Sequence, residues 1–94
     1  MVQVNEYFDG KVKSLGITAN GNKATVGVMQ QGEYEFNTGL KEIMTVVSGS
    51  MSVKLPGAAD WKNFTAGQKF EVPANSKFQL KIPADVSYLC EFIA

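Results

Sequence analysis

EIMTVVSG, the stretch at residues 42–49, has the composition of a β-strand that ends in a tight turn. β-Branched residues are frequent in it, and successive side chains of a strand point to opposite faces of the sheet. Glu42 shares one face with Met44 and Val46, and the residues between them place apolar side chains on the other face as well. We therefore expect this strand to be covered on both sides.

Further strands are expected on either side of this one along the chain. Turn-forming Gly, Pro, Asn and Asp recur at short intervals, and no segment has the apolar period of a helix. The runs between the turns have the usual strand length of about four to eight residues. The sequence predicts nine strands, at residues 10–18, 23–30, 33–38, 42–48, 50–55, 60–64, 69–72, 77–82 and 86–93. Such a series is typical of an all-β sandwich or small barrel.

Alternation along the strands also predicts which side chains point inward. The inward sets are Tyr34, Phe36 and Thr38 in one strand, Phe78, Leu80 and Ile82 in a second, and Val86, Tyr88, Cys90 and Phe92 in the last. Leu89 and Ile93 lie on the opposite face of the last strand. This second apolar face suits a subunit interface, and we expect a homodimer.

The composition bounds both the size and the chemistry of the protein. A chain of 94 residues has room for one domain, spanning residues 1–94, and 45% of its residues are hydrophobic. It contains no His and no Arg, nine Lys balance nine acidic residues, and Cys90 is the single cysteine. These absences exclude a Ser-His-Asp relay, a His-ligated metal, an arginine finger and an internal disulfide.

The sequence also bears on location and partners. The first ten residues contain two acids and no basic residue, so we expect neither a signal sequence nor a transit peptide. Apolar stretches are far too short to span a membrane, and a net charge of zero disfavours nucleic-acid binding. We expect a cytoplasmic protein without membrane or nucleic-acid partners.

Two short patterns resemble the halves of the cupin signature: a Glu followed by six residues and Gly at 42–49, and a Gly followed by five residues and Pro at 67–73. In cupins the first half also has a His-x-His pair before the Glu, and the second has a His after the Pro. The corresponding positions here are Phe36, Thr38 or Leu40 and, for the second half, Phe78. The resemblance implies a cupin-like jelly roll that lacks the metal site.

A closer resemblance extends over most of the chain. Its segments are residues 5–14, 27–29, 32–34, 42–46, 60–61 and 87–90, and they are similar to the small bacterial pyrimidine/purine nucleoside phosphorylases. That family implies a single-domain dimeric cupin that converts diverse nucleosides and inorganic phosphate to free base and pentose 1-phosphate. No cofactor is implied, because phosphate is a co-substrate and the nucleophile.

Glu42 is the candidate catalytic residue. A carboxylate on the inner face beside Met44 costs free energy unless it makes a hydrogen bond or an ion pair. Here it can stabilise positive charge on a pentose ring or accept hydrogen bonds from the ribose hydroxyls. The alternative is a structural Glu42 that pairs with Lys41 or another lysine.

Candidate substrate-binding residues surround the same inner face. They are Tyr34, Phe36, Thr38, Met44, Phe78 and Tyr88. Aromatic walls can stack a base without reading its edges, and Thr38 can donate to phosphate or sugar. The alternative is that the aromatic residues belong to the hydrophobic core, and that Thr38 is present only because β-branched residues favour strands.

Other functions remain open at this level. One is a metal-free cupin that binds a sugar or nucleotide without turnover. A nucleic-acid-binding barrel is suggested by GKVK at residues 10–13, but the strand at 23–30 lacks the exposed aromatic residues it requires. A metal-dependent oxygenase or isomerase is disfavoured because histidine is absent.

Overall fold

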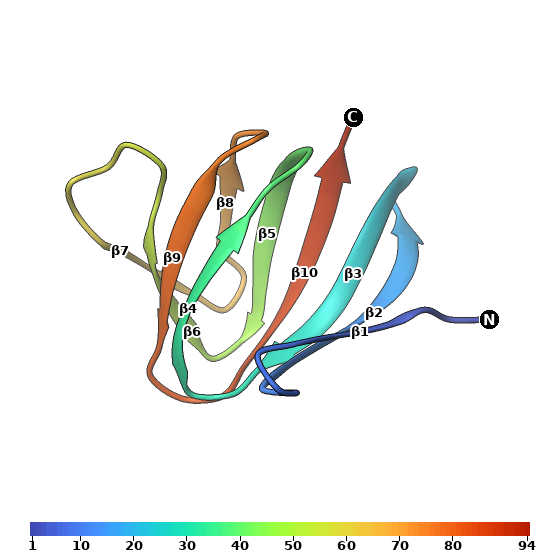
Figure 1. Cartoon of the computed structure of the whole chain (residues 1–94), viewed down its shortest axis with the longest axis horizontal. Coiled ribbons are helices and arrows are strands. Elements are labelled where there is room, and N and C mark those ends of the chain that lie inside the picture. Colours follow the sequence, from blue (N-terminus) through green and yellow to red (C-terminus); the bar gives the residue numbers. More distant parts are fainter.

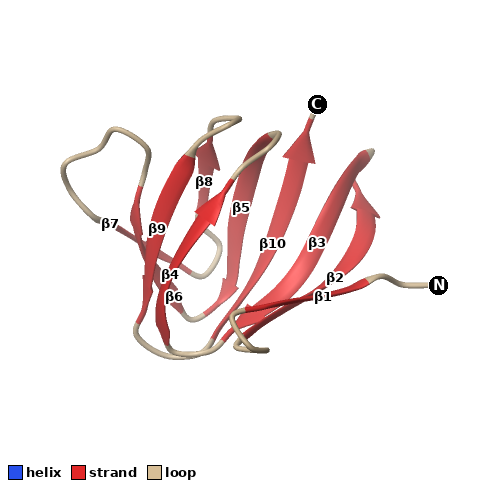
Figure 2. Cartoon of the chain, in the orientation of Figure 1, coloured by secondary structure: helices blue, strands red, loops and turns tan.

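The computed structural model describes residues 1–94 and contains ten strands in two antiparallel sheets (Figure 1). The first sheet has the order β1 (Val4–Tyr7), β2 (Val12–Ala19), β3 (Asn22–Met29), β10 (Val86–Ile93), β5 (Lys41–Ser48) and β8 (Lys69–Val72). The second has the order β4 (Gly32–Asn37), β9 (Lys77–Ile82), β6 (Ser50–Lys54) and β7 (Lys62–Thr65). Figure 2 shows strands and loops only, and no helix of membrane-spanning length and hydrophobicity is present. The all-β sandwich expected from the sequence is confirmed.

All nine predicted strands are present, and β1 is an additional strand. β1 has the sequence VNEY, which is too short and too polar to show the apolar alternation that predicts a strand. In the structure it is mostly exposed. It pairs only with β2, at the edge of the six-stranded sheet. Its position depends on pairing with a neighbour and not on its own composition.

The hairpin between β2 and β3 shows how local sequence sets the register. Asn20 and Gly21 form a two-residue turn with φ angles of 54° and 80°. A type I′ turn requires a positive φ at both central residues, and its twist matches that of the two strands it joins. Asn-Gly is the preferred sequence for this turn. The turn pairs Ala19 with Asn22 and, further along, Val12 with Met29.

The core fills the space between the two sheets. Phe78, Leu80 and Ile82 of β9 are each at most 2% exposed, in agreement with their predicted inward orientation. The cluster also contains Met44 and Val46 of β5. Burial of this kind contributes about 25 cal/mol per Å² of apolar surface, which makes the facing sheets the main source of stability.

β5 is covered only in part on its second face, so the expectation of cover on both sides is wrong for the single chain. Met44 and Val46 are buried, whereas Ile43 and Thr45 are half-buried and Val47 is 57% exposed. No element of the chain packs over the outer surface of the six-stranded sheet at this point, because the second sheet lies on its inner side.

Candidate active site

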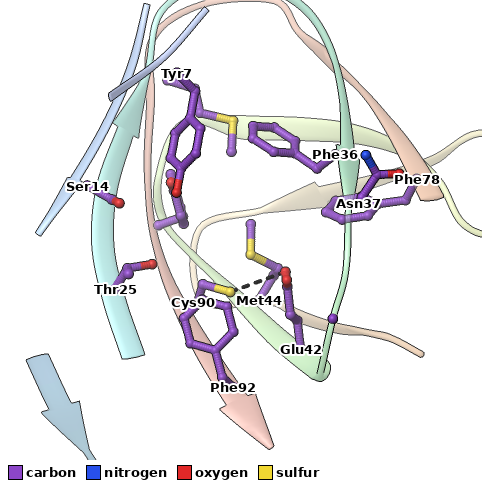
Figure 3. A pocket seen from close by; sticks show the side chains of 13 residues that line it. Tyr7, Ser14, Thr25, Phe36, Asn37, Glu42, Met44, Phe78, Cys90 and Phe92 are labelled. Atoms are coloured by element: carbon purple, nitrogen blue, oxygen red, sulfur yellow. Dashed lines mark hydrogen bonds between the residues drawn. The ribbon is translucent and has the colours of Figure 1, made fainter. Parts of the chain in front are cut away.

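A cavity of about 240 Å³ lies on the inner side of the six-stranded sheet (Figure 3). Its apolar and aromatic lining consists of Tyr7, Met29, Phe36, Met44, Phe78, Tyr88 and Phe92. Its other lining residues are Ser14, Thr25, Asn37, Gly39, Glu42 and Cys90. The cavity is therefore mainly apolar, with a few polar groups directed at one space, as is typical of small-molecule sites.

Glu42 enters this cavity from the beginning of β5. It pairs with Phe92 of β10 on one side and with Val72 of β8 on the other. Its carboxylate accepts a hydrogen bond from the thiol of Cys90, with 3.3 Å between Sγ and Oε1 (the dashed line in Figure 3). The alternative of a pairing with Lys41 is wrong, because Lys41 Nζ lies 3.4 Å from Glu71 Oε2.

Burial controls the protonation of both members of this pair. Desolvation raises the pKa of Glu42, and the hydrogen bond from Cys90 opposes that shift. Desolvation also raises the pKa of the Cys90 thiol, and the nearby negative charge of Glu42 raises it further. Cys90 therefore keeps its proton near neutral pH, and acts as a hydrogen-bond donor and not as a thiolate nucleophile.

Tyr88 lies against β3 at a residue without a side chain. A Cβ atom built on Gly27 would be 2.6 Å from both Cζ and the hydroxyl oxygen of Tyr88, so only glycine leaves room for the ring there. Burial raises the pKa of the Tyr88 phenol, and a hydrogen bond from Ser14 opposes that shift. Ser14 Oγ in turn accepts from Asn5 Nδ2 at 3.2 Å. The Tyr88 hydroxyl thus stays protonated.

Five of the seven predicted site residues come together around the cavity. They are Phe36, Glu42, Met44, Phe78 and Tyr88. Tyr34 and Thr38 point inward but do not line it. The Tyr34 hydroxyl donates to the carbonyl of Gln30 at 2.6 Å, and the Thr38 hydroxyl donates to the carbonyl of Pro73 at 2.6 Å. Both therefore connect backbone segments.

Several lining residues were missed by sequence reasoning. Alternation had already placed Cys90 and Phe92 on the face of Tyr88, and that signal was sufficient to nominate them. Ser14 pairs with Gly27, and Thr25 pairs with Cys90. Their places beside the cavity depend on these strand pairings, which the sequence of a single strand does not reveal. Tyr7 comes from β1, whose sequence gave no strand signal.

The donor atoms of the cavity do not fit the metal site of a cupin. Of the candidate positions for the cupin histidines, Phe36 and Phe78 line the cavity, whereas Thr38 and Leu40 do not. The rings of Phe36 and Phe78 stack with centroids 6.0 Å apart. The remaining donors of metal-ligand type are Glu42 and the protonated thiol of Cys90. No group of three or more His, Cys, Asp or Glu side chains forms elsewhere.

Comparison with solved structures agrees with this architecture. A protein of unknown function from Vibrio parahaemolyticus is 45% identical to this chain, with a TM-score of 0.94 over 99% of each chain. An RmlC-like cupin from Shewanella frigidimarina is 23% identical, with a TM-score of 0.76 over 97% of this chain and 82% of that one. The second likeness shows the fold alone, and the fold is that of a cupin.

Comparison of sequences identifies the family. Curated pyrimidine/purine nucleoside phosphorylases from Tolumonas auensis and Pseudomonas syringae are 59% and 58% identical over 98% of this chain and 99% of theirs. Residues 2–92 match the family profile described as pyrimidine/purine nucleoside phosphorylase. The chain belongs to the pyrimidine/purine nucleoside phosphorylase family.

Proposed function

We propose that this protein catalyses the phosphorolysis of purine and pyrimidine nucleosides to free base and pentose 1-phosphate. Inorganic phosphate is the co-substrate, and no other cofactor takes part. Family membership supports the reaction class. The observation that carries the proposal is the carboxylate of Glu42, which lines an aromatic cavity and pairs with no cation.

The reaction forms a bond between a phosphate oxygen and the anomeric carbon while the glycosidic C–N bond breaks. The base leaves with the bonding electron pair and is protonated, and the pentose ring passes through an oxocarbenium-like state. A carboxylate fixed in a low-dielectric cavity stabilises that developing positive charge. Phosphate supplies the nucleophile, so the protein needs neither a nucleophilic side chain nor histidine.

Tolerance of both purine and pyrimidine bases is expected because the cavity offers a base mainly apolar ring surface and few hydrogen-bonding side chains. Phe36, Phe78 and Tyr88 offer apolar ring surface, which suits purines and pyrimidines alike. Asn37 contributes the only side-chain amide of the lining. A site with so few donors and acceptors discriminates weakly between bases, because strong discrimination requires buried polar groups that a wrong base leaves unpaired.

A second candidate function is a metal-free cupin that binds a sugar or nucleotide without turnover. The observation in its favour is that no lysine lines the cavity, so a phosphate dianion finds no cation there. Phosphorolysis then requires phosphate to bind through hydroxyl and backbone donors at the cavity mouth. Product formation separates the two candidates.

We further propose that the protein is a cytoplasmic homodimer without nucleic-acid or membrane partners. The outer surface of the six-stranded sheet carries many apolar side chains, and Val4, Leu15, Val26 and Leu89 follow one another in cross-strand register over four strands. Ile17, Val28, Ile43 and Ile93 lie in the neighbouring rows, one of which also contains the buried Glu91 between Ala24 and Ile43. An apolar surface this extensive is typical of an interface between copies.

The deciding experiment incubates the purified protein with a panel of purine and pyrimidine nucleosides, with and without phosphate. Phosphate-dependent release of free base supports the enzyme, and tight nucleoside binding without free base supports the non-catalytic alternative. Chelator treatment is expected to leave turnover unchanged, because the cavity lacks a metal-ligand set. Loss of turnover with chelator, restored by one divalent metal, would contradict metal independence.

A further inference from the structure

The cavity contains a single charged group. Glu42 is the only acidic or basic side chain of its lining. Three lysines adjoin lining residues in sequence, and none of them lines the cavity: Lys13 pairs with Glu6, Lys41 pairs with Glu71, and Lys77 is exposed on β9. The cavity as this chain builds it thus has negative charge that no protein group neutralises.

One oxygen of that carboxylate is free to receive a ligand. Oε1 accepts from Cys90, and no hydrogen bond or ion pair of the protein reaches Oε2. Oε2 is also not fully buried, since Thr45 Oγ1 is the one fully buried side-chain polar atom left without a partner. A half-buried carboxylate with an unused oxygen attracts a positive charge more strongly than it would in water.

Aromatic rings surround the same space. Tyr7, Phe36, Phe78, Tyr88 and Phe92 all line it, from β1, β4, β9 and β10. Organic cations are attracted to the faces of such rings, and the attraction grows when water is excluded. A volume of about 240 Å³ accommodates a small molecule but not a large one. Charge, lining and size are therefore complementary to a small organic cation.

We propose that this cavity is a subsite for a small organic cation, held between Glu42 Oε2 and the surrounding aromatic rings. It selects the cation over a neutral molecule of the same shape. The role of this selectivity in catalysis rests on the proposed function, in which the pentose ring becomes cationic, whereas the binding itself does not. The same charge pattern excludes a free phosphate dianion from the cavity.

The pH dependence of this binding is set by the groups around Glu42. Cys90 and Tyr88 face it from β10 as neutral donors, Tyr7 faces the cavity from β1, and β8 presents the apolar Val72. Lys41, Glu71 and Glu91 occupy positions of the opposite alternation on these strands. Lys23 of β3 shares the face of Thr25, but it is exposed and lines an adjoining pocket and not this cavity. Cation affinity is therefore expected to fall as pH decreases through the pKa of Glu42 alone.

The experiment uses choline and its neutral isostere 3,3-dimethylbutan-1-ol, each titrated into the full-length protein by calorimetry at pH 7.5. Choline is expected to bind about 10-fold more tightly or better, as a desolvated cation among aromatic rings should. Glu42→Gln is expected to remove the preference. The matched control is Glu35→Gln, because Glu35 is an exposed β4 carboxylate that accepts from Gln79, outside the cavity.

Equal affinity for the two ligands, no binding of either, or a preference that survives Glu42→Gln would each overturn the cation subsite. The outcome is independent of the test for phosphorolysis. Phosphate-dependent release of base without choline selectivity would refute the subsite and leave the enzyme standing. Choline selectivity that depends on Glu42, without any release of base, would support the subsite and refute the proposed reaction.

Discussion

The thiol of Cys90 donates to Glu42 Oε1 across 3.3 Å, and this is the only hydrogen bond that a side chain of the protein makes to that carboxylate. The two residues belong to adjacent strands, with Cys90 opposite Met44 and Glu42 opposite Phe92. The contact is thus a diagonal one, made possible by the register of β5 and β10. It engages one oxygen of Glu42 and leaves the other without a protein partner.

Replacement of Cys90 is expected to move the acid limb of the pH profile. Cys90→Ala removes the donor that opposes desolvation, so the pKa of Glu42 rises and activity that requires ionised Glu42 is lost at a higher pH. Cys90→Ser supplies a stronger donor and should move the limb in the opposite direction. The measurement is kcat/KM against pH for the three proteins. Identical limbs in all three would contradict the role of Cys90 as a positioning residue.

Glu42→Gln is expected to lower kcat by roughly 10² to 10³-fold, because the amide keeps the shape but not the charge that stabilises an oxocarbenium ion. Steady-state phosphorolysis at saturating nucleoside and phosphate measures the effect. An unchanged kcat would remove Glu42 from the catalytic residues. A loss confined to KM would assign it to substrate binding.

Glu42→Gln is expected to lower kcat but to raise the stability of the folded protein at neutral pH. Burial raises the folded-state pKa of Glu42 above its ordinary value of 4.5, so ionisation costs free energy in the folded state. This cost is absent below the unfolded-state pKa and develops as pH rises through the folded-state pKa. Glu42→Gln should therefore raise Tm at pH 7.5 and have little effect near pH 4. A lower Tm at pH 7.5 would indicate a structural role.

Sequence alternation was sufficient for the all-β sandwich, apart from β1, and for part of the site. It placed Glu42, Met44 and Tyr88 inward because a strand has only two faces, and the structure confirms that orientation. It could not separate residues that line a cavity from residues that face the same way but meet the backbone. Thr38 illustrates the difference, since its partner is the carbonyl of Pro73, 35 residues away.

Long-range pairing accounts for what the sequence did not reveal. Tyr7 reaches the cavity only because β1 adds to the edge of β2, and its own segment is too polar to predict a strand. The contact between Cys90 and Glu42 spans 48 residues. It depends on the register of two strands, which the pattern of either strand alone does not determine.

Gly27→Ala is expected to disturb the site through Tyr88. The new methyl group would meet the ring at 2.6 Å, and overpacking of this kind costs about 1 to 3 kcal/mol. The displaced hydroxyl should also lower kcat/KM. Gly16→Ala is the matched control, because Gly16 lies in the neighbouring strand and its added Cβ would make an ordinary 3.5 Å contact with Gln3.

A double variant separates this clash from a general effect on β3. The new methyl group would meet three atoms closer than 3.0 Å: Cζ and the hydroxyl oxygen of Tyr88, and the backbone oxygen of Lys13 at 2.9 Å. Tyr88→Phe removes the hydroxyl oxygen, so the costs of Gly27→Ala and Tyr88→Phe should not add. Thermal unfolding of the two single variants and the double variant measures the coupling. Strict additivity would show that Gly27 does not act through Tyr88.

Leu89→Asp is expected to convert the proposed dimer to monomers or aggregates. Leu89 pairs with Val26 of β3 and with Thr45 of β5, so it lies near the middle of the outer apolar surface of the six-stranded sheet. A carboxylate there would be desolvated without a partner if two copies packed face to face, and burial of an unpaired charge is strongly destabilising.

Asn63→Asp is the control, because it introduces the same group on exposed β7 of the other sheet and should leave the dimer intact. Val26→Thr is the milder test, because it keeps the side-chain shape and should raise the dissociation constant without preventing folding. Sedimentation of all four proteins at micromolar concentration decides the matter, and a monomeric wild-type protein would refute the interface.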